Sequence, residues 1–320
     1  MTLRSALRLL AAVVAVGALV AATVSQWSRV EDTIAAVSLP GLGVGAVAMV
    51  AATYCSMLAW RAVLADLGSP LSLRDAGGIF FLGQLGKYLP GSLWSVAAQM
   101  ELGRDKGVPR KRSGVAALLV IVMGLTAAGL VAAATLPWVA ELSDYRYVLL
   151  LPALGLVLLH PAVFRRVTTA SLRLLRREPL ERGLSGPGVA KALGWSVAQW
   201  AAYGVGVWAV ARDLPGAPSG LLALGTGAYA LAWSAGFLVL LAPAGAGVRE
   251  GALVLLLAPA YGSGPALGIA LLARLLATLG DLVWGMGSFV RFGVTVVTRG
   301  TQGQDVNTTR RGTKGRRERL

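Results

Sequence analysis

The stretch AGGIFFLGQLGKYLPGSLWSVAAQMELG, residues 76–103, decides the fold, because it is apolar toward both ends and broken in the middle. The break is Gly86-Lys87-Tyr88-Leu89-Pro90-Gly91, and a basic cluster follows the segment at residues 104–112. Each arm of about 14 residues makes roughly 20 Å of helix, whereas the apolar core of a bilayer is about 30 Å thick. A single crossing would also leave the basic cluster outside, against the positive-inside rule. We therefore expect a re-entrant hairpin.

The composition around this segment is that of a membrane protein. The chain has 320 residues, of which 56% are hydrophobic and 14% are charged, and its mean hydropathy is +0.67. Soluble domains carry about 25% charged residues, so a single soluble core is excluded. The chain has one cysteine, Cys55, and one histidine, His160. We therefore expect no disulfide, no metal site and no cofactor.

Uncharged runs of suitable length predict the other membrane spans. They lie at residues 9–24, 39–60, 114–136, 147–163, 192–210 and 221–241. The first run also has the pattern of a signal peptide, which leaves its cleavage open. The stretch 266–297 is too long for one ordinary crossing and forms either one long helix or two short ones. The sequence thus predicts an all-α polytopic membrane protein with about seven to eight transmembrane helices.

Lysine and arginine in the loops orient these spans. The net charge is +15, and much of it lies in the cluster at 104–112, the loop 165–191 and the tail 299–320. We expect all three, and the N-terminus, to be cytoplasmic in the cytoplasmic membrane. The loop is either a positive linker or an interfacial amphipathic helix. The tail is expected to be disordered and to contact anionic headgroups, so no nucleic-acid partner is expected.

A second broken segment suggests an internal repeat. The run PAGAGVREG at 243–251 precedes a short apolar arm, and Gly262-Ser263-Gly264-Pro265 interrupts the chain again. The membrane domain, 1–298, therefore divides into halves of about 1–165 and 190–298, joined by the loop 165–191. Such symmetry is typical of transporters with internal repeats. If 266–297 forms two helices, the halves are parallel repeats; if it forms one, the segment at Pro243 must cross as well.

Charged residues inside the predicted membrane region are few. A charge in mid-membrane costs about 2.5–3.5 kcal/mol on insertion scales, so it persists where it pairs, faces a cavity or acts. We expect a polar cavity between the halves, in which Lys87, Arg249 and Arg274 hold a phosphate while Glu250 or Asp281 balances the charge. Helix ends at the two breaks would add backbone groups that attract anions. The alternative is that these charges form buried structural pairs.

The other candidate substrate-binding residues adjoin the two breaks: Tyr88, Pro90, Gly91 and Trp94 at the first, Gly245 and Gly247 at the second. Trp27, Trp60 and Trp138 stand at predicted span ends, where aromatic belts form. We expect Glu101, near the cytoplasmic surface, to neutralise Arg104 or Lys106.

The broken segments resemble those of a known family. The runs GQLGKYLPGSLW, residues 83–94, and PAGAGVREGA, residues 243–252, are similar to two motifs of the flippase-like family, also called the lysylphosphatidylglycerol synthase transmembrane domain family. The run LLARLLATLGDLVWG follows the second. The resemblance covers about residues 9–297. The matching residues are Gly86, Lys87, Tyr88, Pro90, Gly91, Pro243, Gly245, Gly247, Glu250 and Arg274. Gln99-Met100-Glu101 stands where some relatives carry an arginine.

The resemblance implies movement of an anionic lipid between leaflets, either an aminoacylated phosphatidylglycerol or a polyprenyl-phosphate glycolipid. Only a short basic tail follows residue 297, so we expect no aminoacyl-transferase activity. No Walker A motif occurs, so we expect no ATP hydrolysis through a P-loop. One alternative is a non-transporting membrane subunit that binds a lipid intermediate and recruits a cell-envelope enzyme. Another is an intramembrane transferase that uses Glu250 with Ser92 or Ser95.

Overall fold

A computed structural model describes residues 27–88, 94–136, 182–239 and 245–314, together with six positions between 157 and 169. Every regular element in these ranges is helical, which confirms the predicted all-α class. The predicted spans at 9–24 and almost all of 147–163 lie outside the described residues. Pro90 and Gly91 lie outside them as well.

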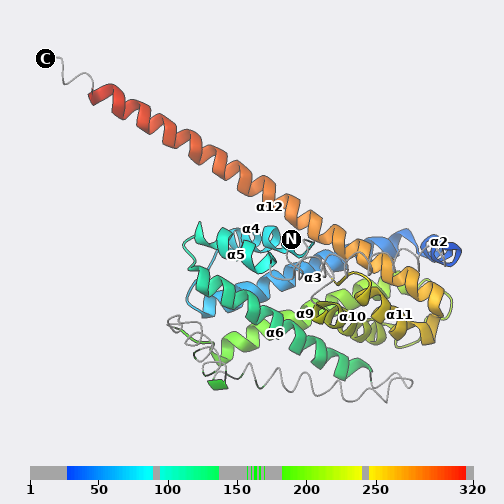
Figure 1. Cartoon of the computed structure of the whole chain (residues 1–320). Helices are drawn as coiled ribbons and strands as arrows, with labels where there is room; N and C mark the ends of the chain where they lie inside the picture. The colour runs from blue at the N-terminus through cyan, green and yellow to red at the C-terminus, as the bar shows by residue number, and fades with distance from the viewer. Residues whose placement is uncertain are drawn as a thin grey trace, which may run out of the picture.

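The described helices form a layered bundle with one long helix projecting from it (Figure 1). They are α2 (Trp27–Ala36), α3 (Leu39–Asp66), α4 (Leu73–Gln84), the 3-10 helix η1 (Leu85–Tyr88), α5 (Trp94–Arg104), α6 (Arg110–Thr135), α9 (Gly186–Ala211), α10 (Leu221–Leu238), α11 (Val248–Tyr261) and α12 (Ser263–Lys314). By length and hydropathy, α3, α6, α10 and the Ser263–Phe289 part of α12 are able to span a membrane. The protein is therefore multi-pass, while the count of seven to eight spans stays a prediction.

The centre of the bundle is an antiparallel pair, α3 and α9. Glycines bring the two helices close together, because they leave no side chain between the backbones. A Cβ on Gly41 would lie 2.7 Å from the carbonyl oxygen of Ala209, and one on Gly206 would lie 2.6 Å from Cε of Met49. The residue numbers rise along α3 as they fall along α9. The pair therefore packs too tightly at these points to accept larger residues.

Matching caps fasten the ends of this pair. Ser38 caps α3, and its backbone N–H and hydroxyl donate to Oδ2 of Asp213, just beyond α9, at 3.1 and 2.6 Å. Ser185 caps α9 and donates in the same way to Asp66, at the end of α3, at 2.6 and 2.7 Å. The hydrogen bonds from Ser38 hold the pKa of Asp213 below its usual value. Each helix starts with Ser-x-Pro-Gly and reaches its aspartate at the same spacing.

The same correspondence extends through two four-helix units. One unit starts with α3 and the other with α9. A glycine with positive φ follows the first helix of each unit: Gly68, at 88°, follows α3, and Gly216, at 85°, follows α9. A second such glycine precedes the last helix of each unit: Gly107, at 77°, precedes α6, and Gly262, at 78°, precedes α12. The unit α3–α4–α5–α6 therefore corresponds to α9–α10–α11–α12. Because α3 and α9 run in opposite directions, the units form an inverted repeat. This excludes the parallel-repeat alternative, and α12 is one helix rather than two.

The first broken segment folds back on itself as a hairpin. Lys106, after α5, forms an ion pair of 2.6 Å with Asp75, at the start of α4. A Cβ on Gly86 would lie 2.9 Å from the backbone N of Ser95, so the arms nearly touch beside the break. The arms of 12 and 11 residues are about 18 and 17 Å long. The hairpin itself is thus present, and its re-entry into a membrane stays a prediction.

The second pair of shorter helices returns in the same manner. The hydroxyl of Tyr261, the last residue of α11, donates to the carbonyl of Ala211 at 3.1 Å, which places this end beside the loop that starts α10. The hairpin α10–α11 therefore opens at the Asp213 end of the central pair, and α4–α5 opens at the Asp66 end. Two apolar clusters of buried side chains support these hairpins.

Helix α12 continues beyond the predicted membrane domain. Its backbone is helical to Lys314, whereas the sequence predicted no ordered structure from residue 299. No proline follows Pro265, so the chain contains no strong helix breaker in this region. Side chains of α12 are described as far as Phe289.

The inverted repeat predicts that the loop between α5 and α6 and the loop between α9 and α10 face opposite sides of the membrane. In a Cys55→Ser background, we expect Ala217→Cys to react with a membrane-impermeant maleimide added to intact cells. We expect Asp105→Cys to react only after permeabilisation, because the basic charge of its loop predicts the cytoplasmic side. Both side chains are exposed, so access to them is limited by the membrane. Labelling of both variants from the same side would contradict the inverted arrangement.

Candidate functional site

A cavity of about 140 Å³ lies between the two breaks. Both four-helix units contribute to its wall. The polar residues that line it are Gln84, Lys87, Tyr88, Ser95, Gln99, Arg249, Arg274, Thr278 and Asp281. Aromatic residues make much of the remaining wall: Trp60, Phe80, Trp233 and Phe237. The cavity thus combines a few convergent polar groups with apolar walls, as small-ligand sites do, and its volume is below their usual range of about 300–1,000 Å³.

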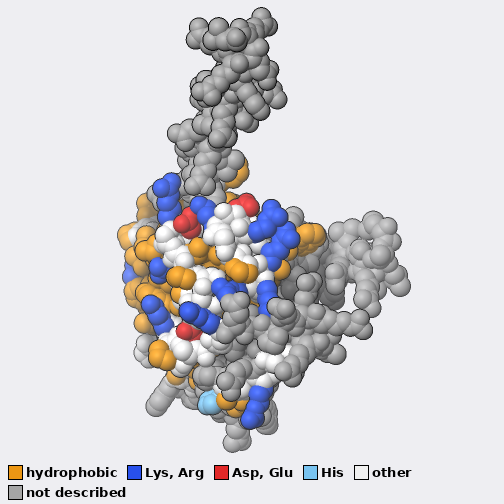
Figure 2. All heavy atoms as spheres, turned by 90° about the vertical axis from the view of Figure 1, so that its left-hand side faces the viewer, with side chains coloured by type: hydrophobic (Ala, Val, Ile, Leu, Met, Phe, Trp, Pro, Cys, Tyr) orange, Lys and Arg blue, Asp and Glu red, His pale blue; other side chains and the backbone are white. Residues whose placement is uncertain are grey.

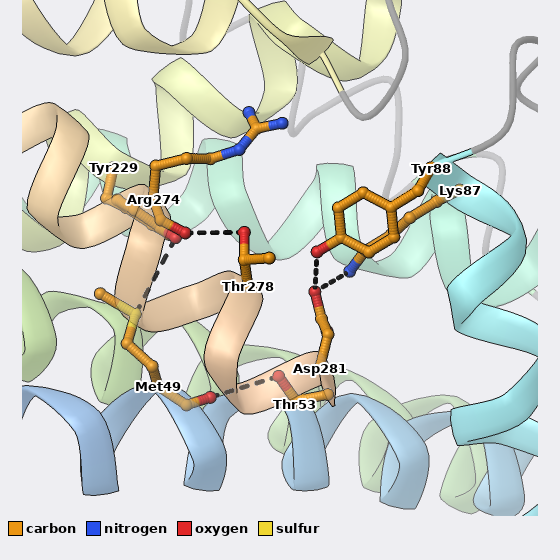
Figure 3. A network of polar contacts seen from close by, with 8 residues as sticks. All are labelled: Met49, Thr53, Lys87, Tyr88, Tyr229, Arg274, Thr278 and Asp281. Carbon is orange, nitrogen blue, oxygen red and sulfur yellow. Dashed lines mark hydrogen bonds and ion pairs between the residues drawn. The ribbon is translucent and has the colours of Figure 1, made fainter. Parts of the chain in front are cut away.

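One carboxylate ties the first break to α12. Asp281 is 6% exposed, and its Oδ2 lies 2.7 Å from Nζ of Lys87 and accepts a hydrogen bond of 2.7 Å from the hydroxyl of Tyr88. Figure 3 shows both side chains reaching from η1 toward Asp281. The short 3-10 helix places two consecutive residues on one acceptor. Lys87 and Asp281 thus neutralise each other while both still face the cavity.

A second ion pair joins the second break to α12. Glu250 is 1% exposed; its Oε1 accepts from Arg274 at 2.6 Å, and its Oε2 accepts from the backbone N–H of Gly247 at 2.6 Å. The carboxylate therefore caps the first turn of α11 and also forms the ion pair with Arg274. Glu250 itself does not line the cavity. The contacts of Glu250 are those of the alternative expectation, in which the buried charges form structural pairs.

Arg249 has no carboxylate partner among the described residues. Its guanidinium lies 4.4 Å above the ring of Tyr229, and its Nη2 is buried without a hydrogen bond to any described group. The hydroxyl of Tyr229 in turn contacts Sδ of Met49 at 3.9 Å, as Figure 3 shows. Since Lys87 and Arg274 are paired, Arg249 leaves the described cavity with one net positive charge.

Glycines at the start of α11 let this arrangement form. Gly245 and Gly247 have φ of 69° and 84°, a region that residues with a side chain rarely occupy. A Cβ on Gly245 would also lie 2.9 Å from backbone atoms of Gly236. Gly245 lines the cavity beside Arg249. The positive end of the α11 dipole is therefore close to the one uncompensated cation.

Two tryptophans lie differently from the sequence predictions. Trp94 is 54% exposed and is not among the lining residues, because α5 turns Ser95 and Gln99 toward the cavity instead. Trp60, expected at a membrane interface, is 1% exposed and lines the cavity. Helix α3 runs on to Asp66, beyond Trp60.

The structure adds uncharged polar residues that the sequence prediction omitted. Gln84 and Gln99 lie in the two arms beside the first break, and Thr278 lies on α12 between Arg274 and Asp281. Attention to charges alone missed them. For the two glutamines the sequence did offer a signal, since an amide side chain in an otherwise apolar arm is costly unless it finds a partner.

The face around the first hairpin is basic. Figure 2 shows Lys and Arg side chains spread over it with few acidic ones. Glu101 is exposed there and pairs with Arg104 at 3.1 Å and with Arg110. The prediction that Glu101 neutralises Arg104 is thus confirmed, whereas Lys106 pairs with Asp75 instead. This face stands apart from the cavity chemistry.

Fold and site together define a class: a multi-pass helical membrane protein with a charged cavity between two oppositely directed hairpins. The chain belongs to the family of the lysylphosphatidylglycerol synthase TM region, whose model matches residues 8–285. The match includes both breaks and every residue that lines the cavity. No curated protein matches the chain at a significant level. Membership in this family associates the protein with membrane lipid metabolism.

The buried Glu250–Arg274 pair predicts a large effect of one substitution on stability. We expect Glu250→Ala to lower the free energy of unfolding by about 3–5 kcal/mol, since it leaves Arg274 uncompensated and uncaps α11. Glu101→Ala is the matched control; its ion pairs are exposed and worth at most about 1 kcal/mol. Denaturant unfolding of purified protein in detergent measures both. Equal, small losses would contradict the structural role of Glu250.

Proposed function

We propose that this protein is a lipid translocator of the cytoplasmic membrane. In this proposal the headgroup of an anionic lipid, an anionic phospholipid or a polyprenyl-phosphate glycolipid, passes through the cavity while the acyl chains stay in the bilayer. The observation that carries the proposal is Arg249, which lines the cavity and has no carboxylate partner among the described residues. An uncompensated buried cation is costly and is expected where an anion binds.

The inverted repeat supports alternating access. Hairpin α4–α5 opens at the Asp66 end of the central pair, and hairpin α10–α11 opens at the Asp213 end. Movement of one unit against the other would expose the same cavity first to one side and then to the other, as in transporters built from inverted repeats. The cavity is fixed between them, so the headgroup crosses without meeting hydrocarbon.

The ion pairs supply exchangeable partners for the headgroup. Lys87 lies 2.7 Å from Asp281, and 33% of its side chain is exposed. A phosphate that binds Arg249 first is then able to compete with Asp281 for Lys87. A membrane potential of 100 mV supplies about 2.3 kcal/mol for each unit charge moved, so no ATP is required.

The alternative is a non-transporting membrane subunit that binds a lipid intermediate and recruits a cell-envelope enzyme. The basic face around the first hairpin favours this alternative, because such a surface suits an acidic partner. In that case, deletion within the basic loop 165–191 abolishes recruitment, and cavity substitutions have little effect. We propose no catalytic activity for the chain in either case.

The proposal predicts that Arg249→Gln slows translocation at least tenfold. A charge-assisted hydrogen bond is worth about 1.5–3 kcal/mol, and the substitution removes the one cation among the described cavity residues that has no carboxylate partner. The measurement uses purified protein in liposomes with fluorescent phosphatidylglycerol, lysyl-phosphatidylglycerol or a polyprenyl-phosphate glycan. Protein-dependent loss of protection from a membrane-impermeant quencher reports translocation.

Arg104→Gln is the control, because Arg104 is 58% exposed and lies outside the cavity. We expect it to leave the rate within about twofold of the unsubstituted protein, since exposed ion pairs contribute little. Absence of translocation for every lipid, with and without an imposed potential, would reject the translocator in favour of the recruiting subunit.

A further inference from the structure

Hairpin α4–α5 meets helix α12 of the other unit along a seam. The ring of Phe81 stacks on that of Trp284 with 4.7 Å between the centroids, and a Cβ on Gly285 would lie 3.0 Å from Cδ1 of Leu85. In a bilayer such contacts gain little from the hydrophobic effect, because lipid tails are as apolar as the side chains that they replace. The apolar side of the seam therefore contributes little to keeping it closed.

The polar side of the seam is a cluster of three residues, which we call the Asp281 latch. Nζ of Lys87 lies 2.7 Å from Oδ2 of Asp281, and the hydroxyl of Tyr88 donates to the same oxygen at 2.7 Å. Both donors belong to η1 at the tip of the hairpin, and the acceptor belongs to α12. Charge-assisted hydrogen bonds are strong where water is excluded. The latch is therefore the contact that decides whether the seam is closed.

The Asp281 latch stands between the cavity and the outer surface of the bundle. All three of its residues line the cavity, while 33% of the Lys87 side chain is exposed. The next residues along α12, Leu282 and Val283, are 41% and 52% exposed. They are apolar and lie in the part of α12 that is able to span a membrane, so we expect them to face lipid. Opening of the latch would therefore join the cavity to the bilayer sideways.

The hairpin has the features of a rigid body between two hinges. Its arms are joined at the root by the ion pair of Lys106 with Asp75, at 2.6 Å. They nearly touch again beside the break, where a Cβ on Gly86 would lie 2.9 Å from backbone atoms of the second arm. Glycines with φ of 88° and 77° precede and follow the hairpin. Residues at the ends of elements are where hinge motions are usually absorbed.

The second hairpin is held more firmly. Its start is joined to α12 by the Glu250–Arg274 pair, in which the carboxylate is 1% exposed. An ion pair costs more to break where it is buried than where one partner is partly exposed. Of these two ion pairs on α12, the one between Lys87 and Asp281 therefore opens more readily.

We propose that the Asp281 latch closes a lateral gate between hairpin α4–α5 and α12, through which the cavity opens to the bilayer. Release of Lys87 and Tyr88 from Asp281 lets the tip of the hairpin move away from α12, while hairpin α10–α11 stays in place. The gate rests on the translocator proposed above and adds the step that admits a lipid from the side. An anionic headgroup that replaces Asp281 as the partner of Lys87 opens the gate without leaving the lysine uncompensated.

Distances between spin labels test the latch without any lipid transport. In a Cys55→Ser background, labels at Ala97→Cys on α5 and Leu282→Cys on α12 report the width of the seam, since both side chains are exposed. In nanodiscs we expect Asp281→Asn to raise the ratio of long to short distances about tenfold. Asp75→Asn is the matched control, because it removes the same charge from an ion pair with a lysine inside the hairpin. A distribution that Asp281→Asn leaves unchanged, or that both variants change alike, would overturn the gate.

A reversible cross-link tests whether the gate serves transport. Leu85→Cys with Gly285→Cys places two thiols across the seam. Oxidation to the disulfide should slow translocation in liposomes at least tenfold, and a reductant should restore the rate. The control is Val207→Cys with Gly225→Cys, which joins α9 to α10 within one unit, where a Cβ on Gly225 would lie 3.4 Å from Cβ of Val207. Oxidation of this control should leave the rate within about twofold.

The two measurements separate this inference from the proposed function. Translocation at an unchanged rate with the seam cross-linked would overturn the gate and leave the translocator standing. If the reduced protein moves no lipid, the translocator fails, and the spin-label distances still decide whether the latch holds the seam. Tyr88→Phe keeps this test valid if Asp281→Asn does not fold. It removes one of the two donors, so the ratio of long to short distances should rise about threefold.

Discussion

The structure depends on one constraint: charges and open backbone groups inside a membrane protein must find partners within the protein. Asp281 meets this constraint for Lys87 and Tyr88 at the first break. At the second break, Glu250 is the partner of Arg274 and of a backbone N–H at the start of α11. Both carboxylates are almost fully buried, and both pairs involve α12, which therefore joins the two breaks. Arg249 is the exception among these groups: it has no carboxylate partner among the described residues, and for that reason we propose that the cavity binds an anion.

The inverted repeat explains why one cavity serves both breaks. Ser38 and Ser185 are bound by Asp213 and Asp66, each at the far end of the opposite helix, so α3 and α9 are fixed as an antiparallel pair. Each central helix is followed by a hairpin that starts and ends on its own side of the molecule. The described residues that flank the two breaks consequently line one cavity from opposite sides. Two opposed hairpins around one site are a natural basis for a gate on either side.

The sequence predicted much of this organisation, because breaks and charges in apolar segments are strong local signals. The helical class and the hairpin at the first break followed from such signals. So did the choice of Lys87, Arg249 and Asp281, which all line the cavity, while their role in binding stays a prediction. The sequence analysis did not predict that the repeat is inverted, because the pairing of α3 with α9 is a long-range contact. The available clue was the Ser-x-Pro-Gly motif that recurs with an aspartate at the same spacing. Trp60 and Gln99 were missed because their burial depends on packing between helices. Trp94 was misplaced for the same reason, as one step along α5 decides which side chain faces the cavity.

A structure determined by electron cryo-microscopy in phosphatidylglycerol nanodiscs tests the role of Arg249 most directly. If the cavity binds a lipid headgroup, phosphate density lies between the two breaks within hydrogen-bond distance of the Arg249 guanidinium. The Glu250–Arg274 pair remains intact in that state. A cavity that holds water alone, with Arg249 paired to a carboxylate and every lipid phosphate outside the bundle, would contradict headgroup binding and leave the charges with a structural role.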